Sequence, residues 1–125
     1  MISSFESARD IITVKSDLKR VAKDLEEMAA AYAVSRKRLG KLSAELEIAY
    51  ARSYAGTDTS MKIDDRKAAA TLETEGLKTE VAVAEAETDV LKQYIRVLES
   101  VLNSCQTLAG LVKSEEHLAR GFAKL

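Results

Sequence analysis

The stretch from Leu77 to Val112 reads LKTEVAVAEAETDVLKQYIRVLESVLNSCQTLAGLV. Apolar and small residues recur in it at alternating steps of four and three, which is the heptad spacing of a coiled-coil seam. The members of this seam are Leu77, Val81, Ala84, Thr88, Leu91, Ile95, Leu98, Leu102, Cys105, Ala109 and Val112. The spacing predicts a long amphipathic helix that packs against a partner helix along this seam.

A second apolar row lies beside the seam on the same predicted helix. Its members are Val83, Ala86, Val90, Tyr94, Val97, Val101, Leu108 and Leu111. A stripe made of both rows is wider than one partner helix can cover, so we expect further helices from other copies of the chain. The residues expected at this oligomer interface are Val90, Leu91, Tyr94, Ile95, Val97, Leu98, Val101, Leu102, Leu108 and Leu111.

A second heptad pattern precedes this helix and predicts its partner within the chain. Its members are Ile11, Val14, Leu18, Val21, Leu25, Met28, Tyr32, Ser35, Leu39, Leu42, Leu46 and Ala49. The pattern ends before Gly56-Thr57-Asp58-Thr59-Ser60, a run of residues that end helices, form turns and begin new helices. We therefore expect a helix over about residues 4–55, a turn over about 56–60 and a helix over about 61–119.

Composition supports this all-α interpretation. The chain has 125 residues, 31% of them charged and 5% aromatic, and it contains no proline. Such a composition is typical of long helices and coiled coils. The expected fold is one domain, a long antiparallel helical hairpin, coiled-coil-like, that assembles into a homo-oligomer because a lone hairpin buries little surface for its length.

The sequence offers few residues for catalysis or for a metal ion. His117 is the one histidine and has no partner pattern for a nucleophile or a metal, and a single cysteine, Cys105, excludes an internal disulfide. There is no glycine-rich phosphate loop. We expect no enzyme, catalytic residue, cofactor or metal site. The N-terminus lacks signal-peptide features and no long apolar run spans a membrane, so we expect a soluble cytoplasmic protein.

The densest basic cluster is Arg36, Lys37, Arg38 and Lys41. The formal net charge of the chain is −1, so any nucleic-acid surface must be local. With a turn near Thr57, residue 38 is expected level with about residue 77, beside an acidic run. The members of that run are Glu73, Glu75, Glu80, Glu85, Glu87 and Asp89. Two interpretations stay open: the runs pair across the hairpin, or the cations bind phosphates.

A second basic group surrounds the predicted turn and includes two tyrosines. Its members are Tyr50, Arg52, Tyr54, Lys62, Arg66 and Lys67. Cations neutralise phosphates and aromatic rings stack on bases, so this combination suits single-stranded nucleic acid. In the alternative interpretation the tyrosines cap the hairpin core, and Asp64 and Asp65 pair with the cations.

Residues at the turn and in the last helix resemble the UvsY-type recombination mediators of tailed phages. The similar positions are Tyr54-Ala55-Gly56, Ser60-Met61, Arg66, Val90-Leu91-Lys92, Cys105 and Val112-Lys113-Ser114, all within roughly residues 40–114. The spacing from Lys92 to Cys105 is shorter than in the family pattern. Ile48 and Tyr50 stand where that family has cations, which leaves Arg52 alone before the turn.

The resemblance implies a small helical oligomer in the cytoplasm of a phage-infected host cell. Such a protein binds single-stranded DNA and helps to load a recombinase where single-strand binding protein would block it. We therefore expect a recombination accessory whose partners are other copies of itself, single-stranded DNA, a recombinase and a single-strand binding protein. The rival hypothesis is a structural coiled-coil scaffold, chaperone or adaptor that binds no nucleic acid.

Overall fold

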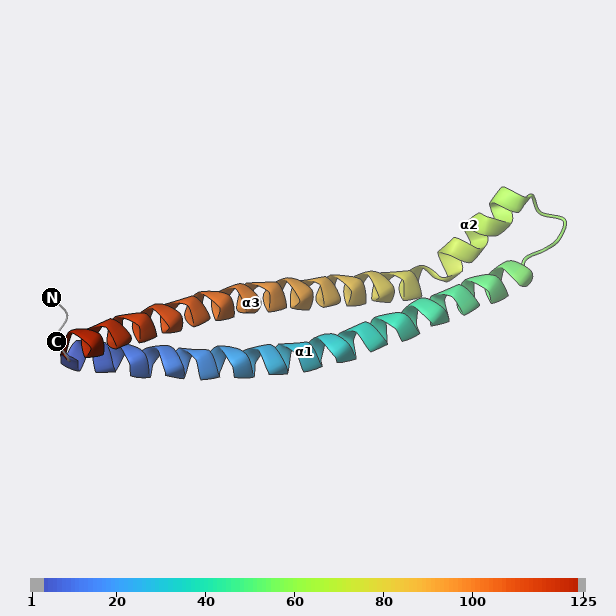
Figure 1. Cartoon of the computed structure of the whole chain (residues 1–125). Coiled ribbons are helices and arrows are strands. Elements are labelled where there is room, and N and C mark those ends of the chain that lie inside the picture. Colours follow the sequence, from blue (N-terminus) through green and yellow to red (C-terminus); the bar gives the residue numbers. More distant parts are fainter. Residues whose placement is uncertain (1–3, 124–125) are drawn as a thin grey trace. The chain divides into compact units, whose positions relative to one another are not determined.

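A computed structural model of the protein describes the backbone of residues 4–123 and the side chains of residues 12–121. This part of the chain contains three helices and no strand (Figure 1). They are α1 (Ser4–Ala55), α2 (Ile63–Glu73) and α3 (Glu75–Ala123). The all-α class expected from the composition is confirmed for the described residues.

The helix expected over about 61–119 is divided in two, because Thr74 interrupts it between α2 and α3. Thr74 has φ −98° and ψ 8°, and both its amide and its hydroxyl donate to the Ala70 carbonyl, at 3.1 and 2.8 Å. A threonine hydroxyl bonded to the carbonyl four residues earlier bends a helix. Gly76 follows and has no Cβ to favour helical geometry. The break lies just before the heptad pattern, which begins at Leu77.

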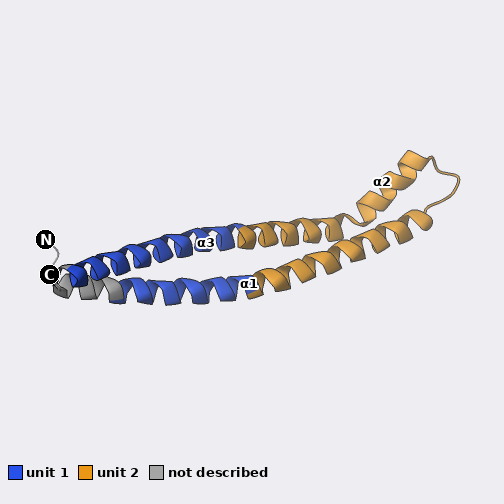
Figure 2. Ribbon diagram, in the orientation of Figure 1, with its two compact units in different colours: residues 1–29, 93–125 blue, residues 30–92 orange. Residues whose placement is uncertain are grey.

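The chain divides into two compact units (Figure 2). The first unit joins residues 1–29 to residues 93–125, and the second comprises residues 30–92. The first unit therefore contains one end of α1 and one end of α3, whereas the second contains the rest of both helices, α2 and the loop over residues 56–62.

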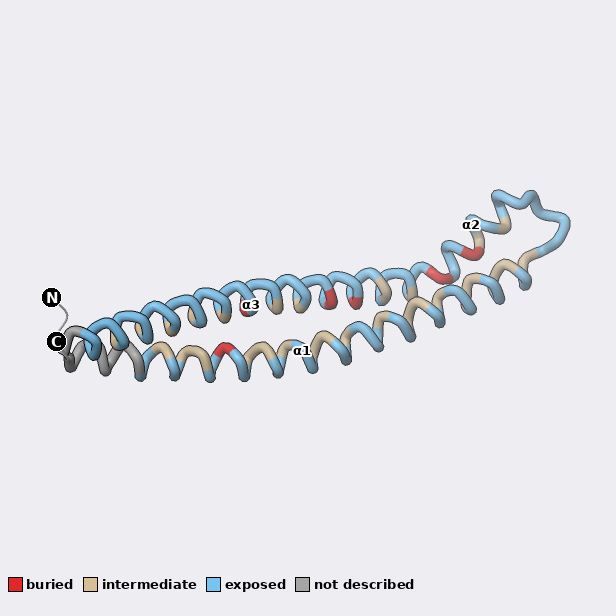
Figure 3. Tube along the Cα trace, viewed as in Figure 1, coloured by how far each residue is buried: buried red, intermediate tan, exposed pale blue. Residues whose placement is uncertain are grey.

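The heptad seams are the covered surfaces of both units (Figure 3). Every seam residue of α3 is buried or half-buried, and so is every seam residue of α1 from Val14 to Ala49; Ile11 lies outside the described side chains. All members of the second row on α3, from Val83 to Leu111, are exposed. The burial thus separates two rows that are equally apolar in sequence.

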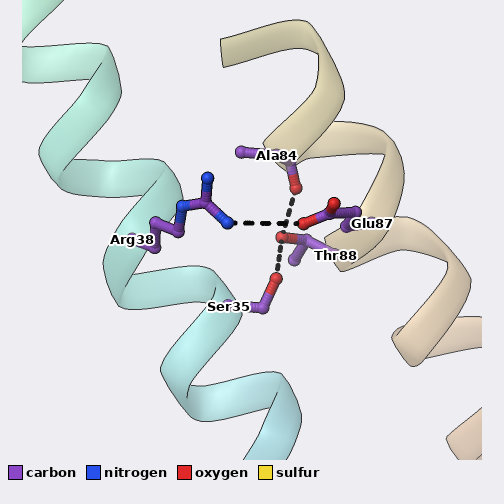
Figure 4. Close-up of polar contacts among 5 residues, drawn as sticks. All are labelled: Ser35, Arg38, Ala84, Glu87 and Thr88. Atoms are coloured by element: carbon purple, nitrogen blue, oxygen red, sulfur yellow. Dashed lines mark hydrogen bonds and ion pairs between the residues drawn. The ribbon is translucent and has the colours of Figure 1, made fainter. Parts of the chain in front are cut away.

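A polar layer interrupts the apolar seam of the second unit. Ser35 is the polar member of the α1 seam, and its hydroxyl lies 2.8 Å from the Thr88 hydroxyl of the α3 seam (Figure 4). Thr88 is 6% exposed, and its hydroxyl donates to the Ala84 carbonyl at 2.7 Å. Because a hydroxyl has one proton to donate, the Ser35 hydroxyl donates to Thr88. The two polar seam residues therefore satisfy each other.

The pairing of α1 with α3 differs from the expected one by about three helical turns. Arg38 forms an ion pair with Glu87, ten residues beyond the position expected for its neighbour. The reason lies in the length of the reversal: Ser53 donates to Glu73, twenty positions away, so the loop and most of α2 lie between two facing residues. A turn of five residues at 56–60 would have required much less chain.

Substitution of Thr88 by Val tests the polar layer. We expect Thr88→Val to lower the free energy of unfolding by about 1–2 kcal/mol, because the Ser35 hydroxyl loses its acceptor in a partly covered site. The double variant Ser35→Ala/Thr88→Val removes both groups and should recover most of that loss. Urea unfolding followed by circular dichroism measures both values. Thr107→Val is the matched control, since Thr107 makes the same bond to the carbonyl four residues back and has no cross-helix hydrogen bond among the described residues.

Gly40 offers a second stability test, because it lies inside α1 on an exposed surface. A Cβ built there meets no atom within 4 Å, so alanine fits without a clash. Gly40→Ala should raise the free energy of unfolding by about 0.5–1 kcal/mol through helix propensity and a less flexible unfolded chain. Thermal unfolding measures the change, and an unchanged or lower midpoint would contradict the expectation.

Candidate nucleic-acid interface

The basic cluster on α1 is exposed and almost free of ion pairs. Arg38 alone has a carboxylate partner, with its Nη1 3.7 Å from the Glu87 Oε2, and the two side chains remain 63% and 56% exposed (Figure 4). Such an exposed pair contributes at most about 1 kcal/mol. Arg36, Lys37 and Lys41 form no ion pair with any residue that the structure describes.

The acidic run on α2 and α3 accordingly makes one ion pair with this cluster among the described residues. Glu73 accepts a hydrogen bond from the Ser53 hydroxyl instead, and Glu87 is the one member of the run that forms an ion pair within the described residues. The observed pairing of α1 with α3 carries Glu75 and Glu80 past the basic cluster and brings Glu85, Glu87 and Asp89 level with it, but of these only Glu87 forms an ion pair among the described residues. Lys37 and Lys41 are four residues apart and share one face of α1, where both are available to phosphate groups.

Arg66 links α2 to the end of α1 through one contact with the loop and two with Tyr54 of α1. Its Nε donates to the Thr57 Oγ1 at 2.8 Å and its Nη2 lies 3.4 Å from the Tyr54 carbonyl oxygen. Its guanidinium carbon also lies 4.5 Å from the centroid of the Tyr54 ring, a cation–π geometry. The expected proximity of Tyr54 and Arg66 is therefore present, and both groups are engaged with each other.

The loop is further held by Thr57 and Asp58. The Thr57 hydroxyl donates to the Tyr54 carbonyl at 2.7 Å, and the Ser60 amide donates to the Asp58 Oδ1 at 2.9 Å. The hydrogen bonds from Ser60 hold the pKa of Asp58 below its ordinary value, with a smaller contribution from the positive charge of Arg66. Asp58 is thus ionised beside Arg66 and reduces the local positive charge.

Tyr50 does not join Tyr54 at this contact. It is half-buried and lines a hollow beside the break between α2 and α3, together with Thr71, Thr74 and Lys78. Arg52, Lys62 and Lys67 are exposed, and none forms an ion pair within the described residues. Asp64 and Asp65 likewise form none with these cations. The second basic group therefore retains three free cations, whereas its aromatic rings are partly covered.

Sequence reasoning missed two residues of this region. The Thr57 hydroxyl forms hydrogen bonds with both Tyr54 and Arg66, and the Ser53 hydroxyl donates a hydrogen bond to Glu73. The role of Thr57 could have been predicted from its place directly after Gly56. A hydroxyl residue that follows the glycine at the end of a helix commonly forms hydrogen bonds with nearby carbonyl groups. Ser53 carried no such signal, because its partner lies far along the sequence.

The residues expected at the oligomer interface fall into two sets. Leu91, Ile95, Leu98 and Leu102 belong to the seam and are already buried or half-buried within the single chain. The other six are exposed by 40–65% of their surface. These six are Val90, Tyr94, Val97, Val101, Leu108 and Leu111. Of the residues expected at an oligomer interface, only those of the second row of α3 are exposed.

Other kinds of site find no support in the described part of the chain. No helix there is both long enough and apolar enough to cross a membrane. No group of three or more metal-binding side chains comes together among those same residues. Comparison with protein-family models, with curated proteins and with solved structures finds no match for this chain. A proposal for the function of this chain therefore rests on the contacts, exposure and charge of its own residues.

Substitution of Arg66 by Ala should loosen the loop. We expect loss of the hydrogen bond to Thr57 and of the cation–π contact to cost about 1–2 kcal/mol locally, so that amides of residues 57–61 exchange their hydrogens roughly tenfold faster. Hydrogen exchange followed by NMR measures this. Lys67→Ala is the control. Lys67 is exposed and adjacent to Arg66 in the sequence, so this substitution removes a cation while the contacts of Arg66 with Thr57 and Tyr54 remain. Equal protection in both variants would refute the role of Arg66.

Proposed function

We propose that the protein is a homo-oligomeric helical hairpin that binds single-stranded DNA and serves as a recombination accessory of the mediator kind. The observation that carries the proposal is the exposed set Arg36, Lys37 and Lys41, which has no ion-pair partner among the described residues. The sequence left open whether these cations pair with the acidic run or bind phosphates. Their lack of carboxylate partners favours phosphates.

The hairpin part of the proposal rests on the pairing within each unit. In the second unit Ser35 contacts Thr88 and Ser53 contacts Glu73. Residue numbers therefore rise along α1 while they fall along the facing segment, as in an antiparallel pair. In the first unit Val14 and Leu18 line one hollow with Ala109 and Val112, all of them seam residues. We propose that α1 and α3 pair in an antiparallel manner within each unit.

Self-association is supported by the surface that one chain leaves exposed. The accessible surface is 9780 Å² for a 13.7 kDa chain, whereas compact monomers of that mass expose about 6,600 Å². The exposed second row of α3 contributes apolar surface to this excess. Association of several copies would cover that row and would also repeat the basic cluster, so that weak sites bind one strand together.

The resemblance to UvsY-type mediators supplies the finer part of the proposal. Single-stranded rather than double-stranded DNA, the recombinase, the single-strand binding protein and the cytoplasm of a phage-infected host cell all come from it. The free cations by themselves support binding to any phosphate backbone.

A structural coiled-coil scaffold or adaptor is the second candidate. The exposed row from Val83 to Leu111 favours it, because an apolar face of that length suits a helical partner and needs no nucleic acid. The two candidates differ in one measurable property, which is salt-dependent binding of an oligonucleotide.

Fluorescence anisotropy with a labelled single-stranded oligonucleotide, measured over a series of salt concentrations, tests the proposal. The triple variant Arg36→Ala/Lys37→Ala/Lys41→Ala should weaken binding and reduce the slope of log K against log salt by about 2, since three phosphate contacts are lost. The matched control is Lys15→Ala/Lys19→Ala/Lys23→Ala, which removes equal charge from exposed positions of the same helix. Loss of equal size in both triples would indicate bulk charge rather than a site. Absence of binding in the unaltered protein would favour the scaffold.

A further inference from the structure

A shallow apolar groove runs between α1 and α3 in the second unit, with a volume of about 910 Å³. Alanines and valines line it: Ala30, Ala31 and Val34 from α1, and Val83, Ala86 and Val90 from α3. We call this surface the alanine groove. It adjoins the seam, but its valines are not covered, since Val34 is 71% and Val90 is 65% exposed.

The shape and composition of the alanine groove suit a helix. Small residues on both walls let another helix approach closely, and valines at the margins can pack against its sides. The volume is on the order of two turns of an α-helix about 10 Å across. The members on α3, Val83, Ala86 and Val90, belong to the exposed second row.

We propose that the alanine groove binds α3 of a second copy of the chain about a two-fold axis, so that two hairpins form a four-helix arrangement. The inference rests on the proposed self-association and specifies which surface produces it. It adds Val34 and the alanines of α1 to an interface that the sequence confined to α3. Both copies would use the same patch, as a two-fold interface requires.

Charge at the edge of the groove favours a second copy over another partner. Arg38 and Glu87 both line the groove, one from each helix, and both stay largely exposed in their mutual contact (Figure 4). A two-fold axis that passes beside this pair would bring Arg38 of one copy toward the partner's Glu87, and the reverse. An edge with one cation and one anion is therefore complementary to itself. A nucleic acid would meet the carboxylate of Glu87 on the same edge.

Mixing two charge variants tests the proposal directly. Arg38→Glu gives an edge with two acidic groups and Glu87→Arg an edge with two basic groups, so each variant alone should self-associate about tenfold more weakly than the unaltered protein. An equimolar mixture should regain affinity, because acidic edges then face basic ones. The pair within each chain stays broken on mixing, so the recovery reports contact between copies alone. Analytical ultracentrifugation over a concentration series measures it.

A second pair of variants guards against misfolding and locates the interface. Val34→Glu places a charge in the groove at a position that is already exposed, and should reduce the mass toward that of a monomer with unchanged helix content. Ala33→Glu lies next to it on an exposed part of α1 outside the groove and should keep the assembly.

Three results would overturn the proposal, and they separate it from the proposed function. An oligomer that resists Val34→Glu but dissociates with Leu108→Glu would assign self-association to the other end of α3 and leave the homo-oligomer intact. No recovery on mixing the charge variants would exclude the two-fold arrangement. A monomer that loses oligonucleotide binding with Val34→Glu would assign the groove to nucleic acid and would also remove the homo-oligomer from the proposed function.

Discussion

The apolar surface that one chain can cover is the constraint on which this protein depends. Two helices of 52 and 49 residues meet along a narrow seam, and no large side chain among the described residues is fully buried. The buried apolar residues are Val21, Ala70, Ala84 and Leu98, two of them alanines. Since stability of a domain comes largely from burial, a chain with so small a core gains much by covering its second apolar row.

Within that seam, specificity comes from a few polar contacts. Heptad seams built from Leu, Val and Ala can slide by whole heptads at small cost, whereas a polar pair fits in one alignment. The Ser35–Thr88 hydrogen bond supplies such an alignment in the second unit, and Ser53 with Glu73 fits the same one. The contacts of Arg66 with Thr57 and Tyr54 then hold the loop.

The same alignment determines which charges remain free. It pairs Arg38 with Glu87 and carries Glu73, Glu75 and Glu80 past the basic cluster, while Arg36, Lys37 and Lys41 form no ion pair with any described residue. A packing feature in the seam thus has a consequence for the electrostatics of the surface. At the loop the effect is opposite: Arg66, which the sequence placed among the binding cations, is engaged by Tyr54 and Thr57. Arg66 is therefore less available to a ligand than Arg36, Lys37 and Lys41, which are exposed.

The sequence by itself determined the helical class, the extent of α1 and the seam residues of both long helices. These features depend on local propensity and on a regular spacing of apolar side chains, which any reader of the chain can count. It also presented a second apolar row beside the α3 seam, without showing how far the single chain leaves that row exposed.

The tertiary structure decided that the second row of α3 stays exposed. It also decided the break at Thr74, the pairing of Arg38 with Glu87 and the contact of Arg66 with Tyr54. Each depends on how much chain the reversal consumes and on contacts between residues far apart in sequence. Periodicity repeats every seven residues and so cannot distinguish one alignment from another a heptad away. Only the side-chain contacts across the helices, Ser35 with Thr88 above all, select the alignment that occurs.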